Sequence, residues 1–124
     1  MVIDADRGKS REMYVMIELI ESRRAQINEI CRRYRVERLE LFGSAVSGKF
    51  DKTSSDLDFI VLFTDAESPG IARRFFGLAE ALEQLLERSV DLITDRPFRN
   101  PYFAQTVAET REILYENRNE KAVV

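Results

Sequence analysis

Three aspartates in apolar segments are the residues of this chain whose types and spacing could do chemistry. Asp56 and Asp58 flank one leucine and lead directly into the apolar run FIVLF at residues 59–63. Because side chains alternate along a strand, both carboxylates would point to one face, about 6.5–7 Å apart along the backbone. Two acids at the head of a core strand are costly unless a cation neutralises them. The pair therefore predicts a divalent-metal site, and Mg²⁺ typically combines one or two carboxylates with substrate phosphate oxygens.

A third acid, Asp91, lies in the short apolar segment VDLIT at residues 90–94. If this segment forms a strand beside the one that begins at Asp56, Asp91 can face the other two acids. Three such carboxylates provide the hard oxygen ligands for one or two Mg²⁺ ions, the arrangement of two-metal phosphoryl and nucleotidyl transfer. Taken alone, Asp91 could equally pair with a buried arginine.

Gly43 and Ser44 follow a predicted strand, and an eleven-residue segment separates Ser44 from Asp56. Gly43 allows a tight turn and a close approach of the backbone, and Ser44 supplies a hydroxyl and an amide suited to phosphate oxygens at a helix N-terminus. A Gly-Ser turn or an Asp-x-Asp sequence is commonplace by itself. The combination with an acid in a third strand is far more specific, and it indicates a nucleotide phosphate site.

The pattern of apolar residues predicts the elements that position these side chains. Helices are expected over 10–34, with a break at 21–24, from 68–70 to about 87 with Pro69 in the first turn, and over 102–109. Strands are expected over 36–42, 56–63, 90–94 and, as a short edge strand, 113–115. This order predicts one α/β (α+β) domain with a small mixed β-sheet and helices mainly on one face.

Composition excludes several function classes. The 124 residues suit one globular domain, and the net charge of −3 argues against strong nucleic-acid binding. The chain has no histidine, which removes the usual serine and cysteine triads and most zinc sites. Cys31 is the single cysteine and is expected to be a buried helix residue in a reducing compartment. With no apolar run near the ~20 residues of a membrane span and no signal peptide, we expect a cytoplasmic protein.

The motifs LFGS (41–44), SDLDFIV (55–61) and VDLI (90–93) resemble those of the minimal nucleotidyltransferases of the DNA polymerase β superfamily. More closely, the chain is similar to the MNT-type antitoxins that pair with HEPN-domain toxins. The resemblance extends to YRV (34–36) and RNPYF (99–103), and so covers roughly residues 26–116. It implies a single nucleotidyltransferase domain over 1–124, with an N-terminal helical segment at 1–35 and a polymerase-β-like catalytic core at 36–116.

The resemblance also implies a role for each candidate residue. Gly43 and Ser44 would hold the triphosphate of ATP. Asp56 and Asp58 would ligate Mg²⁺, and Asp91 would complete the metal site and help to activate the attacking hydroxyl. Antitoxins of this type are similar to protein adenylyltransferases that move AMP from ATP onto a tyrosine of the partner HEPN ribonuclease toxin and so silence it. A homo- or hetero-oligomer is consistent with such a role.

Two other functions remain open at the level of sequence. Ser47 stands where this family often has a basic residue, which favours a non-catalytic antitoxin that masks its toxin by binding. Retention of all three acids favours catalysis, since a pure binder would gain from replacing buried charges. A small-molecule nucleotidyltransferase is the third reading, and the 33 residues after Asp91 leave little room for a substrate domain. Tyr102 and Phe103 are expected to be core or interface residues, and packing of the last helix onto the sheet is favoured over contact with a substrate.

Overall fold

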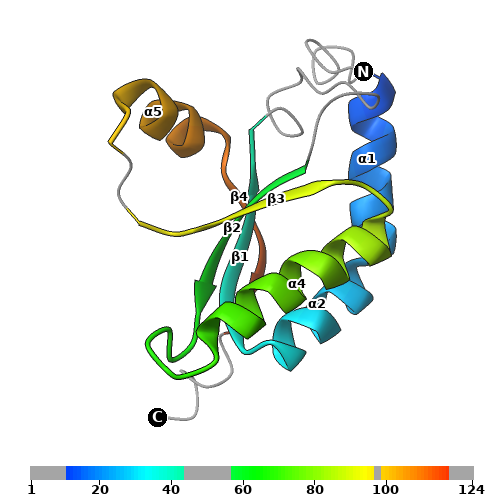
Figure 1. Cartoon of the computed structure of the whole chain (residues 1–124). Coiled ribbons are helices and arrows are strands. Elements are labelled where there is room, and N and C mark those ends of the chain that lie inside the picture. Colours follow the sequence, from blue (N-terminus) through cyan, green and yellow to red (C-terminus); the bar gives the residue numbers. More distant parts are fainter. Residues whose placement is uncertain (1–10, 44–56, 97–98, 118–124) are drawn as a thin grey trace.

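The computed structural model of the chain describes residues 11–43, 57–96 and 99–117. Within these residues one four-stranded sheet has the strand order β3-β2-β1-β4 (Figure 1). β1 pairs antiparallel with both β2 and β4, whereas β2 and β3 run parallel. The strands are β1 (Val36–Phe42), β2 (Leu57–Phe63), β3 (Val90–Thr94) and β4 (Glu112–Glu116). The predicted small mixed sheet is confirmed, including the additional edge strand.

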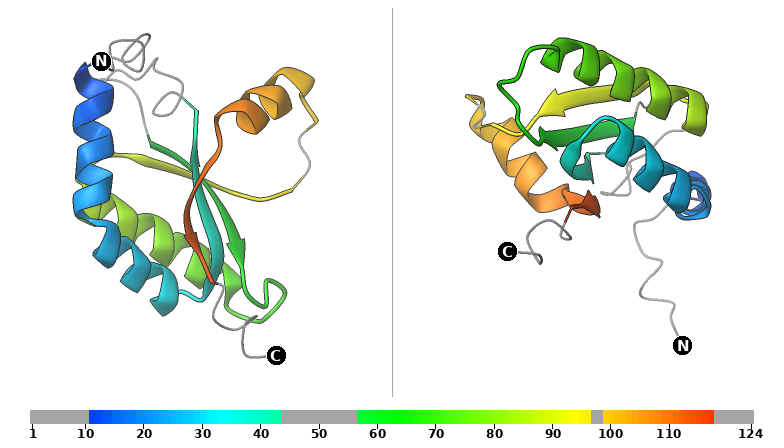
Figure 2. Two further views of the ribbon diagram at one scale, coloured as in Figure 1. Left: turned by 180° about the vertical axis from the view of Figure 1, so that it is seen from behind. Right: turned by 90° about the horizontal axis from the view of Figure 1, so that it is seen from below.

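The helices of the described part divide unequally between the two faces of the sheet. Residues of α1, α2 and α4 share one core cluster with the sheet, whereas α5 packs against the opposite face. Figure 2 shows α5 lying apart from the other helices in both views. The helices are α1 (Arg11–Ser22), α2 (Arg24–Arg33), α4 (Ile71–Leu86) and α5 (Pro101–Thr110). The predicted break between the first two helices falls at Arg23, and helices lie mainly on one face, as predicted.

Alternation along the strands separates the two cores. Leu39 and Leu41 of β1 and Phe59 of β2 belong to the larger cluster beneath α2 and α4. Phe42 of β1 and Ile60 of β2 point to the other face, where they pack with Val107 of α5. Cys31 is fully buried in the larger cluster, which confirms its predicted structural role. Burial raises the pKa of its thiol to about 12, so the thiol stays protonated at neutral pH.

Two local expectations differ from the structure. α4 begins at Ile71 after Gly70, whose φ of +88° is left-handed, so Pro69 precedes the cap and does not lie in the first turn. Tyr102 is 82% exposed and does not pack onto the sheet, because it lies on the outer side of α5. Phe103 does pack, edge-to-face on Phe42 with ring centroids 6.0 Å apart. Residue 10, where the first helix was expected to begin, lies outside the described residues.

Arg74 of α4 binds backbone carbonyl groups at the ends of neighbouring elements. Its guanidinium donates to the carbonyl oxygens of Tyr34, Arg35 and Thr64 at 2.6–3.1 Å. The same group lies 4.9 Å from the centre of the Phe63 ring, a cation–π contact. The ends of α2 and β2 are thereby tied to the first turn of α4. None of the helices described here is long and apolar enough to span a bilayer.

Candidate active site

Asp58 and Asp91 lie side by side on the parallel strands β2 and β3. Their Cα atoms are direct partners in the strand register. Partner residues on adjacent strands point to the same face, with about 4.8 Å between the strands. That face also carries Ile60 and Ile93, which pack with Val107 of α5. The two carboxylates therefore share the α5 face of the sheet, and the other predicted acid, Asp56, lies outside the described residues.

Gly43 brings the turn after β1 against the Asp58 carboxylate. Its φ is +81°, and a Cβ atom at this position would lie 2.5 Å from Asp58 Oδ2. A side chain would therefore be both strained and in collision with the carboxylate. This is the close backbone approach that the sequence predicted for Gly43, although the contact is with Asp58. Ser44, the other predicted phosphate-binding residue, lies outside the described residues.

Thr110 holds the same turn from the end of α5. Its Oγ1 accepts a hydrogen bond from the Gly43 amide at 2.9 Å and donates one to the Thr106 carbonyl at 2.7 Å. The hydroxyl thus holds the Gly43 amide beside the carboxylates. Its own proton is used in the hydrogen bond to the Thr106 carbonyl of α5. The sequence analysis missed this residue. Gly43 and Thr110 are 67 residues apart, and no local pattern connects them.

The carboxylates suit a hard cation with additional oxygen ligands. Asp91 is exposed and makes no hydrogen bond or ion pair within the described part of the chain. Two like charges on neighbouring strands repel each other, and a cation between them offsets that repulsion. The described residues contain no group of three acids, cysteines or histidines able to hold a metal. Asp58 and Asp91 alone still fit Mg²⁺, which takes one or two carboxylates with the substrate's phosphate oxygens.

A second set of acids on the same face is neutralised by arginines. Arg111 donates from Nε to Glu40 Oε2 at 2.9 Å and from Nη2 to Glu40 Oε1 at 2.5 Å. Arg38 donates to Glu40 at 3.1 Å and also to Asp95, which Arg111 Nη2 reaches at 3.3 Å. We call these four residues the arginine–carboxylate clamp. The hydrogen bond from Arg111 lowers the pKa of Glu40, and the same bond raises the pKa of Arg111.

The sequence left open the alternative that Asp91 pairs with a buried arginine. The acid that pairs with arginines is Asp95, which directly follows β3 and lies four residues beyond Asp91. The sequence analysis did not single out Asp95 or Arg111. The one available signal was the alternation of Arg38 and Glu40 with leucines in β1, which places both charges on one face.

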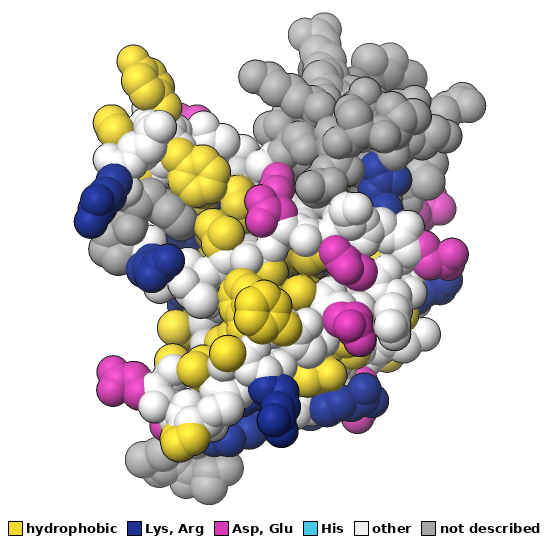
Figure 3. Space-filling model, in the orientation of Figure 1, with side chains coloured by type: hydrophobic (Ala, Val, Ile, Leu, Met, Phe, Trp, Pro, Cys, Tyr) yellow, Lys and Arg dark blue, Asp and Glu magenta, His cyan; other side chains and the backbone are white. Residues whose placement is uncertain are grey.

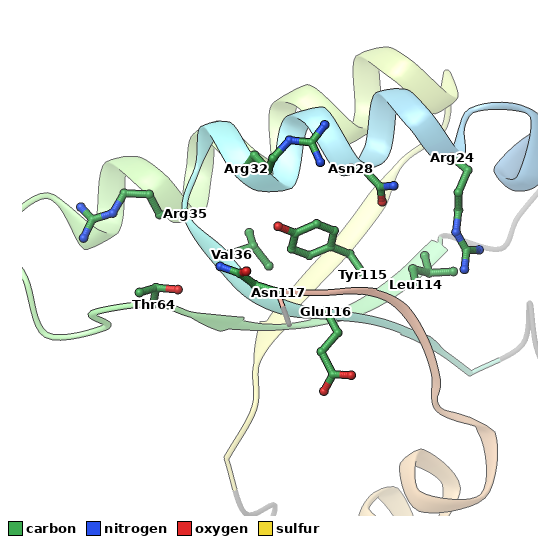
Figure 4. Close-up of a pocket in the computed structure, with 10 residues that line it drawn as sticks. All are labelled: Arg24, Asn28, Arg32, Arg35, Val36, Thr64, Leu114, Tyr115, Glu116 and Asn117. Carbon is green, nitrogen blue, oxygen red and sulfur yellow. The ribbon is translucent and has the colours of Figure 1, made fainter. Parts of the chain in front are cut away.

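A large pocket lies away from these acids, between α2 and β4 (Figure 4). Its volume is about 630 Å³, and it opens on the side of the sheet that carries α2. Figure 4 shows Asn28 and Tyr115 between the helix and the strand, whereas Glu116 points to the opposite side. Arg24, Arg32 and Arg35 line it, but each has an acidic neighbour within 3.5 Å. Size alone therefore does not identify the active site.

Comparison with known proteins gives consistent matches. The family model described as "Nucleotidyltransferase domain" matches residues 23–114. MJ1379 of Methanocaldococcus jannaschii, named as a protein adenylyltransferase, is 32% identical over 99 residues, which are 73% of this chain and 95% of that protein.

Solved structures are similar over most of the chain as well. A protein described as a minimal nucleotidyltransferase is 28% identical with a TM-score of 0.60, covering 77% of this chain and 92% of that one. A chain of the toxin–antitoxin complex MntA–HpeT is 26% identical with a TM-score of 0.54, covering 80% of this chain and 76% of that one. The chain thus shares its fold with these proteins.

Proposed function

Because this chain belongs to the nucleotidyltransferase domain family, we propose that it is a Mg²⁺-dependent protein adenylyltransferase that acts as an antitoxin. In this proposal it transfers AMP from ATP to a tyrosine of a partner HEPN-domain toxin and thereby neutralises it. The observation that carries the proposal is the pairing of Asp58 with Asp91 on the α5 face, beside Gly43. Relatives named as protein adenylyltransferases and the similarity to a toxin–antitoxin complex support the acceptor class.

The roles of the chain's own residues follow from their positions. Asp56, Asp58 and Asp91 would hold Mg²⁺, which stabilises the charge on the entering oxygen and on the departing pyrophosphate when bound. Gly43 and Ser44 would hold the triphosphate, and Thr110 fixes the turn by accepting the hydrogen bond of the Gly43 amide. Asp91 would take the proton of the acceptor hydroxyl. We also propose residues 36–116 as the catalytic core, preceded by the helical segment 1–35.

The bonds exchanged in the proposed reaction balance without a further reactant. The tyrosine oxygen forms a bond to the α-phosphorus as the bond from that phosphorus to the β-phosphate's bridging oxygen breaks. Pyrophosphate leaves, the proton of the hydroxyl passes to the carboxylate, and AMP remains on the toxin. Asp91 is exposed and has no competing partner in the described part of the chain, so its carboxylate is accessible to an incoming hydroxyl.

The direct test mixes the purified chain with the HEPN-domain protein encoded beside it, ATP and Mg²⁺. Intact-mass spectrometry should show the toxin gaining whole AMP units with the wild-type chain and none with Asp58→Asn or after chelation of the metal. Mg-ATP at 100 times its Kd should also stabilise the wild type by about 2.7 kcal/mol in thermal melting, and Asp58→Asn should lose that gain.

The masking alternative makes the opposite prediction in cells. If the chain neutralises its toxin by binding alone, wild type and Asp58→Asn will protect cells equally and the toxin will keep its unmodified mass. That pair of results would refute catalysis. AMP transferred to a small molecule in the absence of any protein acceptor would instead support the small-molecule reading.

A further inference from the structure

Two helices that flank the free edge of β3 carry exposed aromatic side chains, of which Tyr102 lies on the outer side of α5. Phe76 of α4 is 68% exposed, and Tyr102 and Phe103 of α5 are 82% and 40% exposed. The other large hydrophobic residue exposed in the described part of the chain is Ile113, on the opposite edge strand β4. Figure 3 shows apolar side chains on this face from α5 across to α4, with basic side chains at the margin. Contiguous apolar surface of this kind is typical of an interaction site.

A groove of about 390 Å³ runs around the same edge. Its lining comes from three elements and thus passes from the α4 side of the sheet to the α5 side. Leu92 belongs to the core beneath α4, while Ile93 packs on the side of α5. The lining residues are Phe75, Leu92, Ile93, Thr94, Arg96 and Phe103. We call this set, together with the exposed Phe76, the β3-edge surface.

The β3-edge surface is continuous with the proposed active site. Ile93 follows Asp91 by two residues on the same face of β3, a separation of about 6.5–7 Å. A molecule seated in the groove therefore ends beside the carboxylates. β3 is the last strand of the sheet order, so no further strand of the described chain covers this edge.

The chemistry of the surface favours a protein as its occupant. Aromatic residues and arginine are enriched at the energetically important positions of protein interfaces. Arg96 is exposed and makes no ion pair within the described residues, so it can meet an acidic side chain of a partner. The aromatic pair Phe75 and Phe76, 5.4 Å apart, lies beside it as an apolar platform.

We propose that the β3-edge surface docks the protein that accepts AMP, with an apolar side chain in the groove and an acidic residue at Arg96. This inference rests on the proposed function and deepens it, because it states where the acceptor binds. The surface lies beside Asp91 and therefore aligns the acceptor with this carboxylate. Gly43, which would hold the triphosphate, follows β1 and so lies on the other side of Asp58 from β3. Docking and nucleotide binding thus use different residues.

The test measures binding of the neighbour-encoded HEPN-domain protein by titration calorimetry, without ATP, in an Asp58→Asn background that prevents transfer. Phe76→Ser and Arg96→Glu should each weaken binding about 10-fold or more, the loss typical of an interface hot spot. Ile113→Ser is the matched control, since it removes an exposed apolar side chain from the other edge of the sheet and should leave binding within about two-fold.

In the catalytically intact chain, Phe76→Ser should raise the KM for the acceptor and leave the melting shift with Mg-ATP unchanged. Equal binding by wild type and both β3-edge variants would overturn the docking proposal, as would no binding by the wild type. Conversion of a dimer to a monomer by Phe76→Ser in size-exclusion chromatography would also overturn it, because the occupant would then be a second copy. Normal docking without AMP transfer would refute only the catalytic function.

Discussion

Two sets of carboxylates on the α5 face differ in what neutralises them. Glu40 and Asp95 are held by Arg38 and Arg111 in the arginine–carboxylate clamp, and the Glu40 side chain is only 7% exposed. Asp91, four residues before Asp95, is exposed and makes no ion pair in the described residues. Two acids four residues apart thus differ: Asp95 stabilises the fold, whereas Asp91 faces solvent beside Asp58.

The difference indicates how a small sheet accommodates several acids on one face. The clamp lies where β1, the end of β3 and the residue after α5 meet, so two arginines reach both acids. At the other end of β3 the described neighbours of Asp91 are Asp58 and Gly43, and neither of these two residues carries a positive charge. An acid pair in that setting suits an external cation, which is the basis of the proposed metal site.

The largest expected effect is the loss of AMP transfer when the Asp91 carboxylate is replaced. Asp91→Asn should lower AMP transfer by about 10²–10⁴-fold, because it removes the carboxylate that would take the proton of the acceptor hydroxyl and help to hold Mg²⁺. Asp95→Asn is the matched control, because Asp95 lies directly after β3 on the side of the clamp, and it should retain transfer at temperatures where it stays folded. Rates of AMP incorporation into the toxin distinguish the two, and similar losses in both variants would erase the proposed distinction.

Removal of an arginine from the clamp should be the largest effect on stability. Arg111→Met leaves the buried Glu40 with Arg38 alone, and we expect a loss of about 2–4 kcal/mol in the free energy of unfolding. Arg32→Met removes an exposed pair with Glu29 at 3.4 Å and should cost under about 0.5 kcal/mol. Urea denaturation of both variants checks the contrast; equal midpoints would show that the clamp contributes no more than a surface pair.

Substitution of Gly43 should affect both stability and the site. In Gly43→Ala the left-handed φ is strained and the new methyl group collides with the Asp58 carboxylate. We expect the free energy of unfolding to fall by about 1–3 kcal/mol and AMP transfer to fall as well. Gly70→Ala is matched in backbone, since its φ is +88°, but a Cβ there meets nothing within 4 Å. Gly70→Ala should therefore show the strain without loss of transfer, and comparable transfer by both variants would count against a role for the Gly43 contact.

The smallest effect expected is a pH dependence carried by Glu40. Its pKa is lowered in the folded state by Arg111, so ionised Glu40 stabilises the fold above its unfolded pKa of about 4.3. That contribution is lost as the pH falls from about 4.3 through the lower folded value. Glu40→Gln and Arg111→Met should both flatten this limb of the stability curve. A limb of unchanged steepness in both variants would assign the acid sensitivity to other groups.

Local sequence patterns determined most of the secondary structure and the enzyme class. Apolar periodicity predicted β1 and β3 with the bounds that the structure shows, because strand and helix periods are properties of consecutive residues. The motifs around Gly43, Asp58 and Asp91 predicted a nucleotidyltransferase, and the family match over residues 23–114 confirms that class. The ligand roles assigned to the individual acids stay predictions, with Asp56 and Ser44 outside the described residues.

Tertiary structure decided which distant residues meet. The parallel register of β2 and β3 places Asp91 beside Asp58, and the return of β4 to the edge of β1 brings Arg111 to Glu40. Pairing between strands depends on the burial of whole faces and on the course of the connections, neither of which is written in the periodicity of a single segment. For the same reason Thr110 was found only from the folded chain, through its bond to the Gly43 amide.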